Sequence, residues 1–379
     1  MDASTPRQLW LLALANFVIG MGAFVVVGVL SPLAQAFGVT RPEAGALMSV
    51  YAGTYAVASP LLVAATGRLD RRLLLVLGLG LFGLGALAAA LAPSFGWLLA
   101  ARALMALGGG LVTPVAASVG VVLAGPGRQG QALAIVFGGL TLAQVLGVPA
   151  GAWLGYAFGW ASALAVVAAL ALLGLLAVAA ALPRGIRVPV ASLASLAGVL
   201  RSGRRMGAVA FTALFIGALY VCYTFLAPLL ETLYGLSRDG VTGMLALFGL
   251  GAVAGNAMGG RLTDRIGPRW TLVLLCLAQA VLMPALTLPT WPLAVVGALI
   301  FVWSVFAWSF MVPQQARLAA LDPVQLPVLF ALNASAIYVG ATLGSALGGA
   351  VLKGPGLHAL GLFGAALMAL AFASLAAGR

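Results

Sequence analysis

Two short stretches decide the fold: Gly67–Arg72, which reads GRLDRR, and Gly260–Arg269, which reads GRLTDRIGPR. Each joins two long apolar runs, and their first glycines lie 193 residues apart, about half of the 379-residue chain. A set of glycines repeats at the same interval: Gly147, Gly151 and Gly155 recur as Gly340, Gly344 and Gly348. A loop and a glycine spacing that share one offset indicate an internal duplication. We therefore predict two copies of one unit.

The composition indicates that lipid covers most of this chain. It is 63% hydrophobic and 7% charged, with a mean hydropathy of +1.16, whereas a soluble domain is about half apolar and a quarter charged. The net charge of +12 comes from short loops rather than from a basic domain, so we expect no nucleic-acid partner. Cys222 and Cys276 form no metal-ligand pattern and no disulfide framework. We expect no metal and no cofactor.

Apolar runs predict the fold class, an all-α membrane protein. A bilayer core needs about 20 apolar residues per helix. On this measure the sequence predicts twelve spans, at residues 9–30, 43–66, 73–93, 97–123, 130–155, 159–182, 206–230, 239–259, 270–288, 292–313, 325–350 and 357–377. We predict an N-terminal six-helix half at 1–182, a linker at 183–205 and a C-terminal half at 206–379. Six spans per half give both halves one orientation, as in parallel repeats.

The basic residues predict the orientation, because short cytoplasmic loops are enriched in lysine and arginine. With the N-terminus inside, fifteen arginines fall on the cytoplasmic side and only Arg41, Arg238 and Lys353 fall outside. We therefore expect a multi-pass protein of a bacterial-type inner membrane with both termini in the cytoplasm. The bilayer and a small-molecule substrate are the expected partners, and we expect a monomer.

The two basic loops are candidate conformational latches. A glycine permits a sharp exit from a helix, and an aspartate at a helix start is favoured by its partial positive charge. A solvated, positive-inside loop is the simpler interpretation. Because the pattern recurs, we favour latches that tie helices across the cytoplasmic face and break when the protein opens inward. The candidate residues are Gly67, Asp70, Arg71, Gly260, Asp264 and Arg265.

The repeated glycines form a ladder along one face of the fifth span and of the eleventh span. Small residues four apart let helix backbones approach closely in lipid. Tight packing is one role; the other is a sliding or bending surface where the halves rock, since Pro149 removes a backbone hydrogen bond there. The members are Gly139, Gly147, Pro149, Gly151 and Gly155 in the first half, and Gly340, Gly344 and Gly348 in the second.

With these features the chain resembles the major facilitator superfamily. More narrowly, it is similar to the twelve-span drug/proton antiporter group, in the branch of arabinose (sugar) efflux permeases and chloramphenicol exporters. Besides the two loops, the resemblance rests on GVPAG at Gly147–Gly151, VPQQAR at Val312–Arg317 and NASAIYVG at Asn333–Gly340. It covers essentially the whole chain and implies export, but it does not identify the substrate.

Two departures from that resemblance concern proton coupling. Many relatives carry a glutamate where this chain has Ala23, and some carry a histidine where it has Gly109. All seven acidic residues fall at span ends or in loops, so a proton carrier must lie near a membrane edge. The candidate carriers are Glu231 and Asp70, and the proton gradient is the expected energy source.

Arg102 is the one basic residue inside a predicted span. It could extend to the headgroups, or it could face a central cavity, pair with helix carbonyls or Gln144, and attract a polar substrate. An ionisable group inside the membrane is a functional candidate by default.

Neutral polar and aromatic side chains make up the rest of the predicted substrate cavity. Each of them could instead serve helix packing or an interfacial belt. Aromatic faces with a few amides suit sugars, nucleosides or flat neutral drugs. The predicted cavity residues are Asn16, Tyr51, Tyr55, Arg102, Gln144, Tyr220, Tyr223, Trp303, Asn333 and Tyr338.

The sequence therefore predicts a secondary transporter that exports a neutral or polar small molecule by alternating access, in exchange for protons. A facilitator or uptake transporter of the same fold, without proton coupling, remains open. A membrane enzyme is a remote alternative, because it would need several catalytic side chains near one membrane face, and the chain has one histidine.

Overall fold

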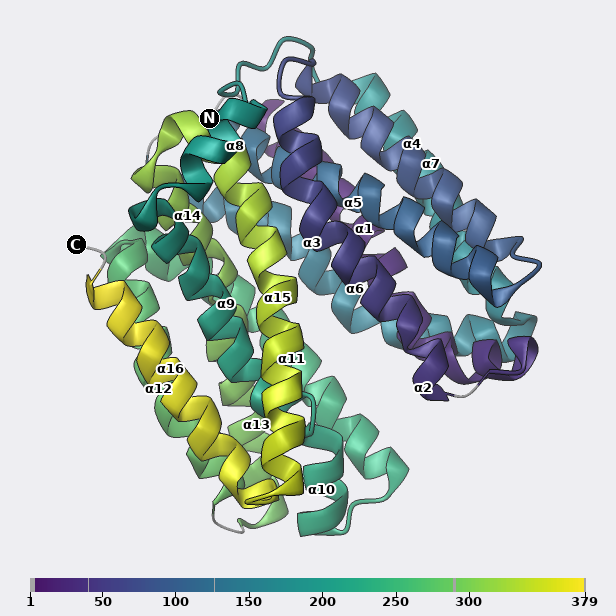
Figure 1. Ribbon diagram of the computed structural model, residues 1–379, viewed down its shortest axis with the longest axis vertical. Helices are drawn as coiled ribbons and strands as arrows, with labels where there is room; N and C mark the ends of the chain where they lie inside the picture. The colour runs from purple at the N-terminus through teal and green to yellow at the C-terminus, as the bar shows by residue number, and fades with distance from the viewer. Residues whose placement is uncertain (1–3, 40, 126, 289–290, 378–379) are drawn as a thin grey trace. The chain divides into compact units, whose positions relative to one another are not determined.

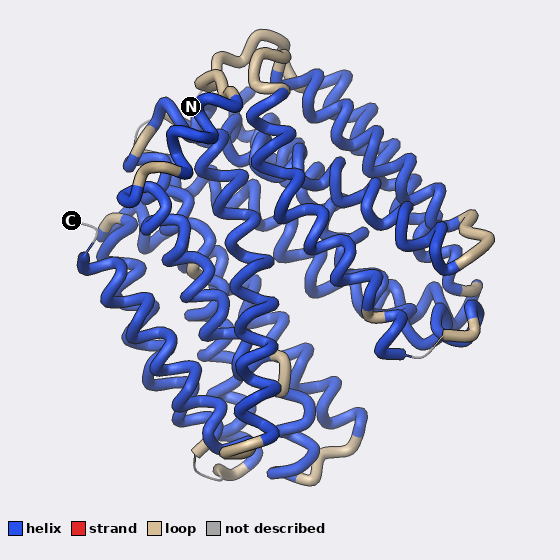
Figure 2. The backbone as a smooth tube through the Cα atoms, viewed as in Figure 1, coloured by secondary structure: helices blue, strands red, loops and turns tan. Residues whose placement is uncertain are grey.

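The computed structural model describes residues 4–39, 41–125, 127–288 and 291–377. Helices make up almost all of these ranges, and no strand occurs within them (Figure 2). Twelve helical segments in the described part of the chain are long and apolar enough to cross a membrane. The predicted all-α, twelve-span architecture is confirmed.

The chain divides into two compact units. One comprises Met1–Gly198 with Asp322–Ser335, and the other comprises Val199–Leu321 with Ala336–Arg379. The division falls inside the predicted linker, but one segment differs from the predicted halves. Asp322–Ser335, which we assigned to the second half, groups with the first unit. The predicted boundaries at 182 and 206 stay predictions.

The N-terminal segment of the first unit contains seven helices and most of an eighth, and residues 322–335 add η1 (Pro323–Gln325) and the start of α15 (Leu326–Lys353). The bounds of the helices in the N-terminal segment are α1 (Ser4–Phe37), α2 (Arg41–Ala44), α3 (Ala46–Ala65), α4 (Arg71–Ala90), α5 (Phe95–Ala124), α6 (Gln129–Phe158), α7 (Trp160–Ala181) and α8 (Leu193–Leu200). Helix α1 packs against α5, α6 and α7, and α4 lies beside both α5 and α7 (Figure 1). The core of this unit is therefore built around α1, α4 and α5.

The rest of the chain begins with α9. The bounds are α9 (Gly203–Tyr223), α10 (Leu226–Tyr234), α11 (Arg238–Ile266), α12 (Pro268–Thr287), α13 (Leu293–Trp308), α14 (Met311–Leu321), η1 (Pro323–Gln325), α15 (Leu326–Lys353), η2 (Leu357–Ala359) and α16 (Leu360–Ala377). Helix α16 packs against α9 and α12, and α11 packs against α13 (Figure 1).

Prolines interrupt two spans of the second unit. A proline inside a helix cannot donate to the carbonyl four residues earlier, and its ring clashes with that carbonyl. For Pro228 that residue is Thr224, and the helix breaks there, between α9 and α10. For Pro313 it is Ser309, and the break separates α13 from α14. By contrast Pro32 lies within the continuous helix α1.

One tryptophan closes a matching helical hairpin in each unit. The Trp97 indole N–H donates to the Ala88 carbonyl at 2.9 Å, across the turn between α4 and α5. The Trp291 indole N–H donates to the Ala285 carbonyl, also at 2.9 Å, across the turn between α12 and α13. The two tryptophans lie 194 residues apart. This shared bond is a structural trace of the duplication.

Two regions predicted as loops are partly helical. Residues 183–205 contain the whole of α8 and the start of α9. Most of the second basic stretch belongs to α11, which continues to Ile266. Gly267, with φ of +82°, then turns the chain into Pro268 at the start of α12. The prediction ended this span at 259 because its arginines looked like loop residues, yet arginine is a good helix former.

Candidate functional site

The first basic loop binds the linker of its own unit. Asp70 is the N-cap of α4, where its Oδ1 accepts from the Leu73 N–H at 3.2 Å. Its Oδ2 accepts from the Gly185 N–H at 2.8 Å. This bond from Gly185 lowers the pKa of the Asp70 carboxyl below its ordinary value of 3.8. Gly185 has φ of +74°, a conformation that favours glycine.

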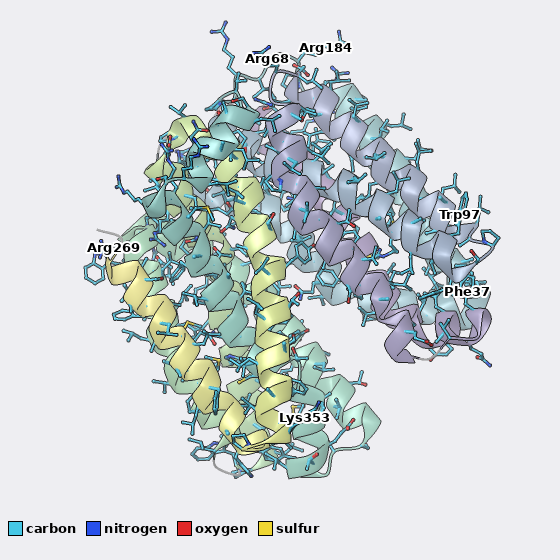
Figure 3. All side chains as sticks on the ribbon, viewed as in Figure 1. Phe37, Arg68, Trp97, Arg184, Arg269 and Lys353 are labelled. Carbon is cyan, nitrogen blue, oxygen red and sulfur yellow. The ribbon has the colours of Figure 1, made fainter. Side chains whose placement is uncertain are left out.

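Arg71 and Gly67 extend this contact along the linker. The buried Arg71 guanidinium donates from Nη2 to the Val188 carbonyl at 3.3 Å and to the Pro189 carbonyl at 3.0 Å. A Cβ at Gly67 would overlap the backbone of Ala191. We call residues 183–200 the linker strap. Figure 3 shows Arg68 of the loop and Arg184 of the strap at one end of the unit, with Phe37 and Trp97 at the other.

The second basic stretch has different local geometry. Asp264 and Arg265 lie in the last turns of α11, and both side chains are exposed. Asp264 is therefore not the N-cap of the next helix, as Asp70 is. The cause is the extra Ile266-Gly267-Pro268, which moves the turn beyond the aspartate. The repeat in sequence is thus not a repeat of the same hydrogen bonds.

The glycine ladders pack inside the units. On α6, Gly139 abuts the backbone of Ala13, and a Cβ on Gly151 would overlap the Val25 carbonyl of α1. Gly147 faces Phe24 of α1, and Gly155 faces Val29 of α1. On α15, Gly340, Gly344 and Gly348 face Ala213, Gly217 and Val221 of α9. The ladders join the fifth span to the first span of each unit, because glycine permits backbone contact there. The expected packing role is thus present, and the surface where the halves rock stays a prediction.

Arg102 of α5 is fully buried and holds three helices of the first unit together. Its Nη1 donates to the Gly22 carbonyl of α1 at 2.7 Å, and its Nε donates to the Leu47 carbonyl of α3 at 3.4 Å. The guanidinium also lies 4.5 Å from the ring centroid of Tyr51, within range of a cation–π interaction. The expected pairing with helix carbonyls is present, and Gln144, the other expected partner, is half-buried.

Small residues stand at the two positions where this sequence departs from the family that it resembles. A Cβ on Gly109 would lie 2.8 Å from the Tyr51 hydroxyl and 3.6 Å from the Tyr55 ring. The space that a histidine would need is therefore filled by Tyr51. Ala23 is buried with 8% exposure. The two tyrosine ring centroids lie 6.2 Å apart.

Two further predicted residues of the first unit, Asn16 and Asn333, are buried amides. Asn16 is buried and donates from Nδ2 to the Val136 carbonyl of α6 at 3.1 Å. Its Oδ1 is buried and accepts no hydrogen bond from the described part of the chain. Asn333 is also fully buried, in the part of α15 that groups with this unit. An acceptor left without a donor in the interior costs about 1–3 kcal/mol, so Asn16 has capacity for a ligand or water.

A row of aromatic rings crosses the second unit. Tyr220 packs edge-on against Tyr223 at 5.5 Å, Tyr223 stacks on Phe248 at 4.8 Å, and Phe248 packs edge-on against Trp303 at 5.3 Å between centroids. Gln279 of α12 donates to the Trp303 carbonyl at 3.3 Å. The Gln279 Oε1 and the Trp303 Nε1 have no partner among the described residues. Tyr338 of α15 is half-buried.

Sequence reasoning placed three of these rings in the cavity but missed Phe248 and Gln279. Phe248 has no polar atom and lies in a long apolar run, so nothing in the sequence separates it from lipid-facing residues. Gln279 is the only amide in the apolar run 270–288, and that isolation was a usable signal.

No buried carboxylate accompanies these groups among the side chains whose burial the structure describes. Arg71 and Arg102 are the charged side chains buried there. Glu43 and Glu231 are exposed, at α2 and α10, and Asp322 caps η1. The same ranges contain no group of three or more His, Cys, Asp or Glu side chains arranged to hold a metal ion. Each unit therefore supplies aromatic rings and neutral polar atoms rather than acids.

The sequence of residues 12–324 matches the family model that describes the Major Facilitator Superfamily. The chain belongs to the Major Facilitator Superfamily. Among similar proteins, the uncharacterized MFS-type transporter YbcL of Bacillus subtilis (strain 168) is 33% identical, over 96% of this chain and 93% of YbcL. The inner membrane transport protein YdhP of Escherichia coli (strain K12) is 31% identical, over 95% of this chain and 92% of YdhP.

Solved structures of the superfamily show the same fold. The transporter FucP in its outward conformation superposes with a TM-score of 0.80, at 17% identity over 99% of each chain. The human organic anion transporter MFSD10 gives a TM-score of 0.75, at 22% identity over 99% of this chain and 100% of that one. The chain is thus a multi-pass inner-membrane transporter of this superfamily and not an enzyme.

Proposed function

We propose that this chain exports a neutral or polar small molecule by alternating access. The observation that carries the proposal is the charge of the interior: Arg102 is fully buried, and no Asp or Glu is buried among the side chains whose burial the structure describes. A lipophilic cation would find no counter-ion there. A sugar, a nucleoside or an amphenicol-type drug needs only rings to stack on and a few hydrogen-bonding groups.

Each unit contains its own group of side chains that we propose for substrate binding. Arg102, Tyr51 and Tyr55 form a polar group in the first unit. The aromatic row from Tyr220 to Trp303 offers stacking faces in the second. Restriction to the drug/proton antiporter group and the arabinose-efflux branch belongs to the same proposal, and the sequence motifs quoted above support it. We expect the transporter to act as a monomer.

Proton exchange is the proposed energy source, and the first basic loop narrows the choice of carrier. The lowered pKa of Asp70 keeps its carboxylate ionised at neutral pH, which suits a latch better than a proton carrier. Glu231 is exposed on α10, close to the break after α9. We therefore favour Glu231 as the carrier. Asp70 and Arg71 then act as a latch on the linker strap.

A facilitator or uptake transporter without proton coupling is the second candidate. The lack of a buried carboxylate among the side chains whose burial the structure describes favours it, since a midplane proton carrier is usually an Asp, Glu or His. The solved structures with the same fold do not distinguish a proton-coupled exporter from an uncoupled transporter. FucP is described as a fucose:proton symporter and MFSD10 as an organic anion transporter, and one fold hosts many functions.

The test is transport in liposomes that contain a pH-sensitive dye. The purified protein would be given pentoses, amphenicols, purine nucleosides and lipophilic cations, each with and without an imposed proton gradient. Glu231→Gln and Asp70→Asn would be compared with the wild type. We expect neutral substrates to move, with proton counterflow that Glu231→Gln abolishes and Asp70→Asn retains.

Two outcomes would contradict the proposal. Transport of lipophilic cations alone would exclude the proposed substrate class. Exchange of a neutral substrate without any proton signal would exclude antiport and establish the facilitator.

A further inference from the structure

The short helix α8 carries an apolar stripe that the described part of the protein does not cover. Leu193 and Leu200 are 59% and 50% exposed, and Ala197 between them is exposed as well. These positions, four and three residues apart, share one face of a helix. Leu196 and Val199 lie on the adjoining side of the helix and are buried. Helix α8 is thus apolar on two sides, one packed and one open.

Arginines flank this stripe on both sides. Arg184 and Arg187 precede it, Arg201 and Arg204 follow it, and all four are exposed. No Asp or Glu occurs between 182 and 205. An apolar helical face bordered by basic side chains is the pattern of a helix that lies in a membrane interface and contacts anionic lipids.

The covalent connections keep the strap near the bilayer surface. It begins directly after α7, which ends at Ala181, and it ends just before α9, which starts at Gly203. Both of these helices are candidate membrane spans. The bonds from Asp70 and Arg71 hold residues 185–189 at the end of the first unit. The Ser192 hydroxyl accepts from the Ser195 N–H at 3.0 Å and so fixes the start of α8.

We propose that helix α8 of the linker strap lies in the headgroup layer of the adjacent leaflet and binds anionic phospholipids. Leu193, Ala197 and Leu200 contact the acyl chains, and the flanking arginines bind the lipid phosphates. The arginine distribution predicts that this leaflet is the cytoplasmic one. The strap would then be tied to the first unit by the basic loop and to the membrane by α8. This inference depends on the membrane fold and not on the proposed substrate or coupling.

The test measures the depth of spin labels on the strap. Because Cys222 and Cys276 are both buried, single cysteines can be introduced into the full chain at Leu193, Ala197 or Leu200. Pro183→Cys, exposed but outside the stripe, is the water-facing control, and Leu196→Cys is the buried control. Collisions with oxygen and with a neutral nickel chelate would be measured in vesicles of phosphatidylcholine, alone or with equal parts phosphatidylglycerol.

In vesicles with phosphatidylglycerol we expect the three stripe labels to meet oxygen readily and the nickel chelate rarely. The label at 183 should show the opposite ratio, and the label at 196 should meet neither probe. Replacing Arg201 and Arg204 by glutamine should shift the stripe labels toward water, by about fivefold in partitioning per arginine. Replacement of both by lysine should preserve the lipid contact.

Three results would overturn the proposal. Free collision of the stripe labels with the nickel chelate in both vesicle types would place α8 in water. Equal depth with and without phosphatidylglycerol would remove the role of anionic lipid. Shielding of the stripe labels from both probes would show that protein, rather than lipid, covers the stripe.

Discussion

At the scale of single residues, Arg102 has a structural role in the first unit and a proposed role in substrate binding. A buried guanidinium requires hydrogen-bond acceptors, and the Gly22 and Leu47 carbonyls supply them. Both belong to helices that α5 must hold in place. The same group is the deepest positive charge that the first unit can offer to a substrate. The two roles can be separated by substitutions that differ in charge and in shape.

The first prediction concerns Arg102→Lys and Arg102→Met. Lysine retains the charge but cannot reach two carbonyls with a planar fork. We expect it to lower stability by about 1.5–3 kcal/mol, the value of one charge-assisted hydrogen bond. Methionine removes the buried charge with similar length, so the protein should fold but lose transport. Thermal unfolding in detergent and uptake in liposomes measure the two effects. Normal transport by Arg102→Met would make this arginine purely structural.

The second prediction concerns the pH dependence of the strap. Since the folded-state pKa of Asp70 lies below the ordinary 3.8, its stabilising contribution is complete above that value and is lost as the pH falls through the folded-state pKa. A fluorophore on Arg187→Cys should therefore be immobile at pH 7 and become mobile only below about pH 3.8. When Asp70→Asn is added, the fluorophore should be mobile at both pH values. A pH-independent signal in the wild-type background would contradict the Asp70–Gly185 bond as the clamp.

Some of these residue roles were accessible from sequence and others were not. Arg102 was evident because it is the one basic residue in a predicted span. The Gly185 partner of Asp70 was not, because 115 residues separate them and no local pattern links them. The occupation of the space beside Gly109 by Tyr51 likewise depends on tertiary packing.

At the scale of elements, the contact between α6 and α1 and that between α15 and α9 are set by glycine. A Cβ at Gly151 would overlap the Val25 carbonyl, and one at Gly344 would overlap the Gly217 carbonyl. A backbone atom cannot move aside as a side chain can, so each helix pair would have to separate. Such overpacking costs about 1–3 kcal/mol.

The third prediction follows for Gly151→Ala and Gly344→Ala. Each should lower the free energy of unfolding by about 1–3 kcal/mol. This loss is measured as a lower thermal unfolding temperature in detergent. Gly53→Ala in α3 is the matched control, because its Cβ would meet nothing within 4 Å. It should leave stability unchanged or raise it by up to about 1 kcal/mol, since alanine is the better helix former. Equal effects at all three positions would exclude the close-approach explanation.

The fourth prediction concerns the break between α9 and α10. Pro228→Ala restores the missing N–H, so residues 224 and 225 should become helical and the amides of residues 224–228 should exchange hydrogen more slowly. Pro32→Ala is the control, because α1 is already continuous there. Pro32→Ala should change the hydrogen exchange of the neighbouring amides little. Unchanged exchange in Pro228→Ala would mean that packing, and not the proline, creates the break.

Helix existence was predictable from hydrophobic run length, but helix ends and breaks were less so. The two basic stretches look alike in sequence, yet one becomes an N-cap and the other the end of α11. Three extra residues after Asp264 make that difference, and their effect emerges only with the turn at Gly267.

At the scale of the whole molecule, the fifth prediction is the sidedness of the chain in the membrane. Figure 3 shows Arg68 and Arg184 at one end of the first unit, and Arg269 and Lys353 at opposite ends of the second. In right-side-out membranes, a thiol reagent that cannot cross the bilayer should label Lys353→Cys and not Arg68→Cys or Arg184→Cys. Inverted membranes should reverse the pattern. The unsubstituted protein is the control, because both native cysteines are buried.

The twelve spans and their duplication were predictable because bilayer thickness and a fixed sequence offset constrain the whole chain at once. The grouping of Asp322–Ser335 with the first unit was not. Apolar runs report how many helices exist, whereas the assignment of a helix to a unit depends on which neighbours it packs against.

The glycine contacts also bear on the ancestry of the molecule. In each unit the ladder lies on the fifth span and faces the first span, at positions 193 residues apart. Two independent origins would have to produce the same helix pair in the same register. Common descent is the simpler explanation, and it places this contact in a six-span ancestor before its gene was doubled. The fifth-to-first helix pairing is therefore older than the twelve-span chain that now contains it twice.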